Sequence, residues 1–346
     1  MSRTSHPQPT PQPQERPVST ATQSSPWRHQ VERALSSNIA PIVAALIIVS
    51  VALSFMSDVF LTSSNLTNIV TQSAVVGIAA VGATFVIITS GIDLSVGATM
   101  ALAGFLGAQL AHHSDSGWLG LLAVMGVAVL VGAFNGFSVA WLGLAPFIVT
   151  LAVMGMARGL TLQFSQGESV YDLPSTLNWL GSADLAGLKV SAIVTVLLFL
   201  VGHLLLSRTT FGHRVYAVGG NADAARLAGI NVKGVIFSTY VIAAVCAGVA
   251  AIVLVGRLDS ATPNAATGTE LQVIAAVVIG GTSLFGGKGS MIGTLVGVLL
   301  IGVINNGLTL LNVSSFWVQF VQGALIFLAV LLDSFNTGRL KRAATS

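Results

Sequence analysis

Residues 207–233, SRTTFGHRVYAVGGNADAARLAGINVK, form a polar segment that separates two long apolar runs. Within it, Asn221 is a favourable helix N-cap, Asp223 places a negative charge in the first turn, and Gly229 is a common helix stop. The segment therefore predicts one short helix over 221–229, shaped to dock onto a partner. It also holds four of the fifteen Lys and Arg residues: Arg208, Arg214, Arg226 and Lys233.

The composition of the whole chain is that of a helical membrane protein. Hydrophobic residues make up 53% and charged residues 8%, and the mean hydropathy is +0.85, whereas a soluble protein has about 25% charged residues. Each spanning helix needs about 20 apolar residues, and the 37 glycines suit close helix packing in lipid. We therefore predict an all-α, polytopic membrane protein that contacts lipid. Its basic residues lie in loops and tails, so its basic pI does not indicate nucleic-acid binding.

The chain divides by composition into three parts. Residues 1–35 are rich in Pro, Gln, Ser and Thr and show no signal-peptide pattern, so we expect a disordered cytosolic tail, with a regulatory arm as the alternative. Residues 36–335 hold the apolar runs and predict the transmembrane domain, with 207–233 as its cytosolic loop. Residues 336–346 predict a cytosolic C-terminal tail.

Ten apolar runs are candidates for membrane spans. If the N-terminus lies inside, twelve basic residues fall on the inner side and two, Lys189 and Arg257, on the outer side. The positive-inside rule therefore predicts that both termini and the 207–233 segment are cytosolic. The candidate spans are 39–56, 68–89, 94–111, 118–141, 145–164, 190–206, 235–256, 270–285, 290–311 and 315–332.

Two segments of the chain match each other. Ser90–Gly104 reads SGIDLSVGATMALAG and Thr267–Gly281 reads TGTELQVIAAVVIGG. Ser90 with Asp93, and Thr267 with Glu270, have the spacing of a capping box, which predicts that each pair begins a helix. These would be the third and eighth spans, which enter from opposite faces, so we predict an inverted repeat of spans 2–5 and 7–10, with chance similarity as the alternative.

The two carboxylates of this repeat have a second interpretation. Asp93 and Glu270 lie at predicted helix starts, where a capping carboxylate is favourable, so we interpret them as caps. A carboxylate within a membrane span can instead carry an ion or a proton, and that alternative stays open.

Several side chains in the spans are candidates for lining a pathway. Amides both donate and accept hydrogen bonds, so they suit a hydroxyl-rich ligand, but they also join helices, and the sequence leaves both roles open. Arg158, within the fifth span, is expected to anchor or join helices rather than to contact a substrate. The candidate pathway residues are Asn135, Asn305, Asn306 and Gln319.

Signals for enzymatic chemistry are weak. Residues 280–290, GGTSLFGGKGS, look like a phosphate-binding loop, but Gly289 follows Lys288 where Ser or Thr must bind magnesium. We expect a tight cytosolic turn there. The histidines lack metal-site spacing, and we therefore predict no catalytic residue, no metal and no bound cofactor.

Several motifs together carry a family resemblance. GIDLSVG (91–97), FGHRVYAVGGNADAARLAGI (211–230), AAVVIGGTSLFGGKGS (275–290) and NNGLTLLNVSSFW (305–317) resemble permease subunits of bacterial ribose-type ABC importers. The resemblance implies about ten helices, as in type II importers, and a location in the inner membrane. It also implies a second permease subunit, a cytosolic ATPase that binds ATP and magnesium, and an extracytoplasmic sugar-binding protein.

The resemblance also implies roles for residues of the 207–233 segment, which would be the coupling segment that inserts into the ATPase. The matching residues are Gly212, Arg214, Gly219, Gly220, Asn221, Ala225, Arg226, Leu227 and Gly229. The cargo would be ribose or a similar pentose or hexose. Thr269–Gln272 reads TELQ where family members often have Tyr-Glu-Leu-Asp, so the cargo can differ. Autoinducer-2, a polyol or a nucleoside are alternatives, and an ion-coupled transporter is the rival mechanism.

Overall fold

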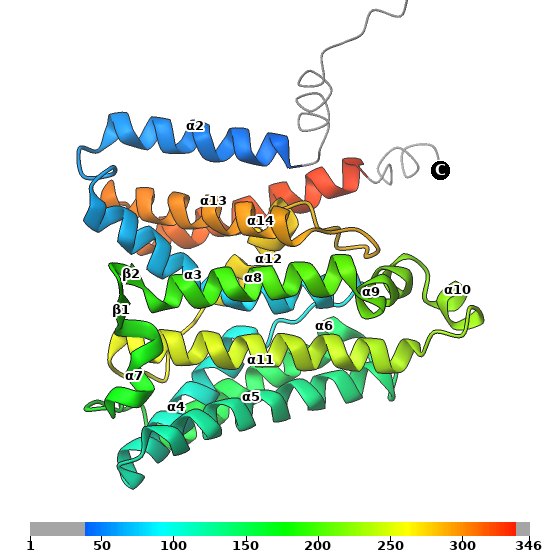
Figure 1. The fold of residues 1–346 in the computed structure, drawn as a ribbon, viewed down its shortest axis with the longest axis horizontal. Helices are drawn as coiled ribbons and strands as arrows, with labels where there is room; N and C mark the ends of the chain where they lie inside the picture. Colours follow the sequence, from blue (N-terminus) through cyan, green and yellow to red (C-terminus); the bar gives the residue numbers. More distant parts are fainter. Residues whose placement is uncertain (1–38, 337–346) are drawn as a thin grey trace, which may run out of the picture. The chain divides into compact units, whose positions relative to one another are not determined.

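The computed structural model describes residues 39–336, which are almost entirely helical (Figure 1). The predicted tail 1–35 lies outside the described residues, as does almost all of the predicted tail 336–346. The long helices are α2 (Ala40–Met56), α3 (Ser63–Ile88), α4 (Val96–Ser114), α5 (Gly117–Ala140), α6 (Pro146–Ser165), α8 (Val190–Arg208), α11 (Val232–Leu258), α13 (Met291–Leu310) and α14 (Ser315–Asn336).

Shorter elements connect these helices. Four of them are helical: α7 (Ser175–Ser182), α9 (Thr210–Gly220), α10 (Ala222–Leu227) and α12 (Thr269–Ile279). The strands β1 (Asp184–Leu185) and β2 (Leu188–Lys189) pair antiparallel, with Asp184 opposite Lys189. The all-α prediction is therefore confirmed for the described residues apart from this small hairpin.

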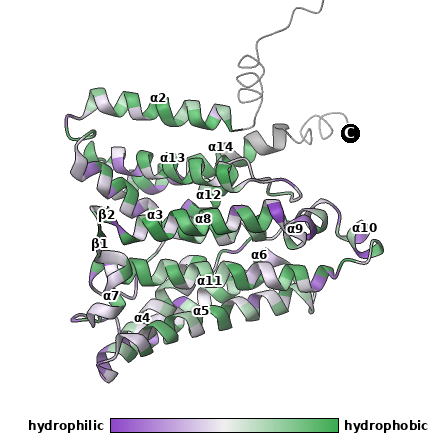
Figure 2. Cartoon of the chain, in the orientation of Figure 1, coloured by the Kyte–Doolittle hydropathy of each residue, from purple (hydrophilic) through white to green (hydrophobic). Residues whose placement is uncertain are grey.

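Six helices of the described part are long and apolar enough to cross a membrane: α3, α5, α6, α8, α11 and α13. This agrees with a polytopic membrane protein, and a helix overlaps each of the ten predicted spans. The count of about ten membrane spans stays a prediction, because α2, α4, α12 and α14 are not among these six helices. Green apolar residues dominate the helices in Figure 2, as a lipid-facing surface requires.

The core lies around α3 and α11. In the most apolar stretch of each helix, 94% and 67% of the residues are buried, respectively. Small residues let these helices approach closely: a Cβ on Gly82 of α3 would lie 2.5 Å from the Cα of Ala243 in α11. Such contacts are how helices associate in lipid. By contrast, α5, α6 and α8 keep large apolar side chains exposed, among them Leu130, Ile148 and Val196.

Helix α12 is shorter than the predicted span 270–285. It ends at Ile279, because Gly280 packs against the backbone of Gly293 and Gly281 turns left-handed with φ +88°. Its eleven residues extend about 16 Å, roughly half of a bilayer core. Gln272 in its first turn bonds to Asn305 in the last third of α13, so α12 begins well along the length of α13.

The first turns of α4 and α12 are in contact. A Cβ on Gly97 would collide with the carboxylate of Glu270 and with the carbonyl oxygen of Ala266. From this contact α4 runs along α11 toward Val255, which Gly104 approaches, whereas α12 runs toward the beginning of α13. The two helices therefore start side by side and run in opposite directions.

Candidate functional site

Helix α10 has a complete cap at each end. The side-chain oxygen of Asn221 accepts a hydrogen bond from the Ala224 amide at 2.9 Å, which confirms the predicted N-cap. At the other end, Gly229 has φ +80°, and the amide of Ile230 donates to the Ala225 carbonyl at 3.0 Å. With the bond from the Gly229 amide to Arg226, this is a Schellman motif, which explains why glycine suits position 229.

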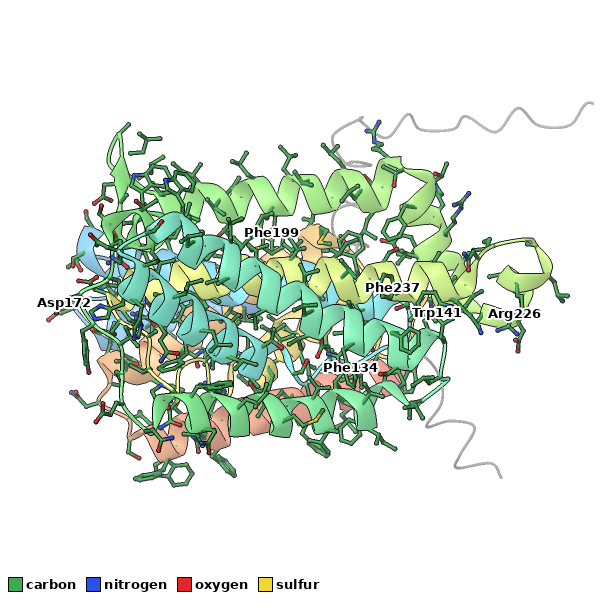
Figure 3. The ribbon with its side chains drawn as sticks, turned by 90° about the horizontal axis from the view of Figure 1, so that it is seen from below. Phe134, Trp141, Asp172, Phe199, Arg226 and Phe237 are labelled. Atoms are coloured by element: carbon green, nitrogen blue, oxygen red, sulfur yellow. The ribbon has the colours of Figure 1, made fainter. Side chains whose placement is uncertain are left out.

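The capped helix has one buried side and one exposed side. Ala225 is 5% exposed and packs in the main core, whereas Leu227 is 91% exposed. Arg226 and Asp223 form a solvent-exposed ion pair at 3.4 Å, a contact that contributes little to stability. In Figure 3, Arg226 lies at one end of the helices and Asp172, of the predicted outer loop, at the opposite end. The exposed side of α10 is therefore available to a partner.

The preceding helix α9 is not among the predicted elements, because the sequence predicts a single short helix over 221–229 within the 207–233 segment. Thr209 caps it by accepting a bond from the Gly212 amide at 3.1 Å. Gly212 is buried and a Cβ there would collide with the carbonyls of Leu205 and Leu206. The Thr-x-x-Gly spacing was the signal that could have found this helix start.

Gly219 joins α9 to two other segments. A Cβ at this position would collide with the carbonyl oxygen of Ile88, at the end of α3. That same carbonyl accepts the Gly287 amide at 2.9 Å, and the Ser90 hydroxyl donates to Gly219 at 3.3 Å and to Phe285 at 2.9 Å. Residues 88–91, 216–220 and 285–289 thus form one packed unit, which we call the α9 junction.

The 280–290 loop completes the α9 junction with its backbone. Gly286 and Gly287 have φ +81° and +71°, values that favour glycine. The Tyr216 hydroxyl donates to the Gly289 carbonyl at 2.9 Å, and burial raises the pKa of Tyr216, so this donor stays protonated. Sequence reasoning missed Tyr216 and Gly287, because nothing local indicates contacts between segments about 70 residues apart.

The predicted coupling residues therefore lie in two consecutive helices and their caps. Gly212, Gly219 and Ala225 are buried and hold the helices in place. The others are exposed and accessible to a partner: Arg214, Gly220, Asn221, Arg226, Leu227 and Gly229.

The two predicted capping boxes are wrong. Ser90 has φ +63° and directs its hydroxyl into the α9 junction, and α4 begins only at Val96. Asp93 instead accepts two bonds from Ser95, from its amide at 2.8 Å and its hydroxyl at 2.6 Å.

The second box is wrong for a different reason. The Thr267 hydroxyl donates to the Asn264 carbonyl at 2.8 Å, and the N-cap of α12 is Gly268, with φ +78°. Glu270 does lie in the first turn of α12, where its carboxylate accepts the Gly268 amide at 3.3 Å. The matching motifs thus have different local structures.

Three of the candidate pathway residues hold helices together. Asn306 and Asn65 exchange two buried side-chain bonds, at 3.0 and 2.8 Å, which join α13 to α3. Asn135 donates to the Ser95 hydroxyl at 2.8 Å. Asn305 donates to Gln272 at 3.3 Å and accepts from Gln322 at 3.2 Å, which links α13 to α12 and α14. Gln319 is exposed on α14.

Arg158 has the joining role expected of it. Its guanidinium donates to the Ala265 carbonyl at 2.9 Å and to Pro263 at 3.5 Å, in the loop that precedes α12. It therefore holds that loop against α6.

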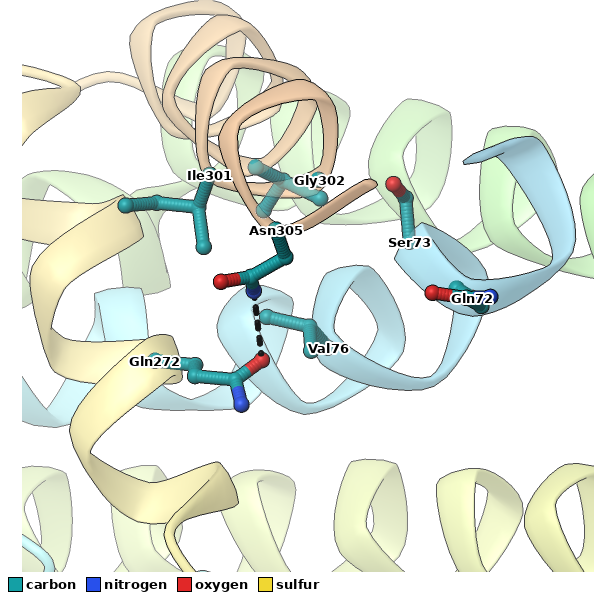
Figure 4. A pocket seen from close by; sticks show the side chains of 8 residues that line it. Gln72, Ser73, Val76, Gln272, Ile301, Gly302 and Asn305 are labelled. Atoms are coloured by element: carbon teal, nitrogen blue, oxygen red, sulfur yellow. Dashed lines mark hydrogen bonds between the residues drawn. The ribbon is translucent and has the colours of Figure 1, made fainter. Parts of the chain in front are cut away.

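A small pocket opens beside Asn305 (Figure 4). It has a volume of about 40 Å³, enough for two or three water-sized groups. We call it the amide pocket; its polar residues are Gln72, Ser73, Gln272 and Asn305, and its apolar wall is Val76, Val298, Ile301 and Gly302. The Ser73 hydroxyl is buried there and has no hydrogen-bond partner within the described part of the chain.

Comparisons with known proteins agree with one another. The family model "Branched-chain amino acid transport system / permease component" matches residues 65–330. The chain is 39% identical over 317 residues to the ribose import permease protein RbsC of Escherichia coli K12, covering 90% of this chain and 98% of that protein. No solved structure matches the chain.

Two further relatives come from the same organism. The D-allose transport system permease protein AlsC is 42% identical over 289 residues, covering 83% of this chain and 88% of its own length. The xylose transport system permease protein XylH is 31% identical over 372 aligned residues, covering 89% and 94%.

Proposed function

We propose that this chain, which belongs to the permease family of ribose-type ABC sugar importers, forms the translocation pathway of an ATP-driven importer for a monosaccharide. Relatives that cover most of its length are named for ribose, allose and xylose transport. A neutral pentose or hexose is therefore the proposed cargo. The chain would lie in the bacterial inner membrane with both termini cytosolic, as its basic residues favour.

The observation that carries the coupling role is the combination of α10 with the α9 junction. Helix α10 offers an exposed leucine and an exposed arginine on a capped scaffold. The preceding helix is hydrogen-bonded to Ser90, just after the C-terminal end of α3, and to Gly289 in the loop between α12 and α13. We infer that α10 docks into a groove of a cytosolic ABC ATPase that has apolar and acidic side chains.

Movement of the ATPase would then reach the membrane helices through backbone contacts. A shift of α9 would displace residues 88–91 and 285–289. The backbone of Gly219 packs directly on Ile88 and Gly287, with no room even for a Cβ between them. Those segments precede α4 and follow α12, the two helices whose first turns meet at Gly97 and Glu270. The opposite directions of these helices support an inverted repeat, whose halves would exchange inward and outward access.

Other partners complete the importer. Loops at the end opposite α10, including α7 and the β1–β2 hairpin, offer a surface for an extracytoplasmic sugar-binding protein. A second copy of this chain would close the pathway. ATP and magnesium would bind to the ATPase, and this chain would bind no cofactor and catalyse no covalent step.

Binding-protein-stimulated ATP hydrolysis tests the proposal. The chain is assembled in nanodiscs with the ATPase and binding protein encoded beside it, and ribose, allose, xylose, polyols, nucleosides and autoinducer-2 are added in turn. We expect one sugar to stimulate hydrolysis, and Leu227→Glu to abolish that stimulation. Leu227→Met, which keeps an apolar side chain at the same exposed position, is the control and should retain the stimulation. Stimulation only by a non-sugar would correct the cargo, and uptake driven by an ion gradient without the ATPase would contradict the proposal.

A further inference from the structure

The amide pocket departs from the apolar character of the helices around it. Gln72, in the third turn of α3, is exposed although most of that helix is buried. Gln272 and Gln322 are partly exposed on α12 and α14. Amides exposed to lipid would lose their hydrogen bonds at a cost of several kcal/mol each. This face is therefore expected to contact water or a subunit partner rather than lipid.

The Ser73 hydroxyl gives a second, independent indication. Thr67, Thr71 and Thr84 of the same helix donate their hydroxyls back to its own carbonyls, the usual arrangement in a membrane helix. Ser73 is 5% exposed, yet its hydroxyl makes no such bond. It lies against Gly302, where a Cβ would collide with the Ser73 oxygen. A hydroxyl left unpaired at such burial costs about 1–3 kcal/mol unless a ligand or water satisfies it.

The groups of the pocket that are free to bond a ligand are uncharged and include both hydrogen-bond donors and an acceptor. Asn305 uses one N–H toward Gln272 (Figure 4). Its oxygen accepts from Gln322, which leaves one N–H of Asn305 for a ligand. The Ser73 hydroxyl can both donate and accept. None of the eight described residues that line the pocket is charged, so it suits a neutral hydroxyl better than an ion or a zwitterion.

The size of the pocket limits what enters it. About 40 Å³ accommodates a hydroxyl or a hydroxymethyl group but not a sugar ring. The apolar wall formed by Val76, Val298 and Ile301 would contact the C–H face of such a group.

We propose that the amide pocket binds one hydroxyl-bearing edge of the sugar during translocation, with Ser73, Gln272 and Asn305 as its hydrogen-bonding residues. This inference rests on the proposed function and adds a specific subsite to it. The ring would lie outside the pocket, over Gln72, and would pass on when the helices rearrange.

Uptake of paired sugars tests the subsite. Proteoliposomes that contain the complete importer are given D-ribose or 5-deoxy-D-ribose, and D-allose or 6-deoxy-D-allose, and kcat/KM is measured for each. Ser73→Ala should lower kcat/KM about tenfold for the sugar whose hydroxyl enters the pocket, and less than twofold for its deoxy partner. The same binding protein is used with wild type and variant. Its own sugar preference therefore cancels when the variant's kcat/KM is divided by the wild-type value for each sugar.

Gln163→Leu is the matched control for Gln272→Leu, because Gln163 is an exposed amide on α6, away from the pocket. Only Gln272→Leu should reduce the preference for the hydroxylated sugar. Equal losses for both members of every pair would mean that these amides only join helices, and would overturn the subsite.

A thiol-accessibility experiment separates this inference from the proposed function. In a Cys246→Ser background, Gln72→Cys should react with a membrane-impermeant thiol reagent at least tenfold faster than Val70→Cys, an exposed position two residues earlier on α3. Failure of every sugar to be transported would contradict the proposed function. Equally slow labelling at positions 72 and 70 would overturn the water-lined pocket, even if transport is confirmed.

Discussion

The hydroxyl of Ser90 donates a hydrogen bond to the carbonyl oxygen of Gly219 at 3.3 Å, although the two residues are 129 positions apart in the chain. The same hydroxyl reaches Phe285 at 2.9 Å. One side chain therefore links the end of α3, the helix before α10, and the loop between α12 and α13. This link makes the α9 junction the expected route from the ATPase to the membrane helices.

Gly219→Ala should uncouple the importer. A Cβ at this position would collide with the Ile88 carbonyl, so α9 must move away from α3. We expect binding-protein-stimulated ATP hydrolysis to fall at least tenfold while the ATPase still co-purifies. Gly220→Ala is the control, since a Cβ at the next residue would have no atom of residues 39–336 within 4 Å. Equal effects of the two substitutions would contradict a role for this close contact.

Asn221→Ala should fray α10. Loss of the cap that Asn221 provides to the Ala224 amide costs about 1 kcal/mol. Hydrogen–deuterium exchange over 222–227 should speed up about fivefold, and the affinity for the ATPase should fall with it. Asn221→Asp keeps the capping oxygen and should restore both. Unchanged exchange in Asn221→Ala would show that the helix is held by other contacts.

The short helix could be predicted because its determinants are local. Asn221, Asp223 and Gly229 act within a few residues of each other, and their cap geometry matches the sequence signals. The start of α4 could not be predicted in the same way. Ser90 has the spacing of a capping residue, but its hydroxyl is used in a contact with Gly219 and Phe285.

The same limit applies to the pathway amides. Composition indicated that they donate and accept, but only the fold distinguishes Asn306, paired with Asn65, from Asn305, which borders a pocket. A contact between α3 and α13 spans 241 residues and leaves no local pattern. The order and location of the long helices were predictable, because apolar run length is itself a local property.

Asn306→Leu should destabilise the membrane domain without changing sugar preference. The buried amide of its partner Asn65 would lose both of the bonds that it exchanges with Asn306, at a cost of about 1–3 kcal/mol. The double substitution Asn65→Leu with Asn306→Leu should recover part of that loss. Thermal unfolding in detergent measures both, and a shift in sugar selectivity instead would return Asn306 to the pathway.

Tyr216→Phe should lower stability by about 1 kcal/mol at neutral pH, because the Gly289 carbonyl loses its donor. Burial raises the pKa of Tyr216 in the folded state, so its contribution is present below the unfolded value of 10.0 and is lost as the pH rises through the folded value. The difference in melting temperature between wild type and variant should therefore be constant from pH 6 to about 9 and shrink above about 10. A difference that changes near neutral pH would implicate another group.

The most direct measurement is sugar uptake into proteoliposomes that contain this chain, its ATPase and its binding protein, with and without enclosed ATP. We expect uptake of one monosaccharide that requires ATP and the binding protein, and that is lost in Gly219→Ala but kept in Gly220→Ala. Uptake that proceeds without ATP, or that survives Gly219→Ala unchanged, would contradict a permease driven through the α9 junction.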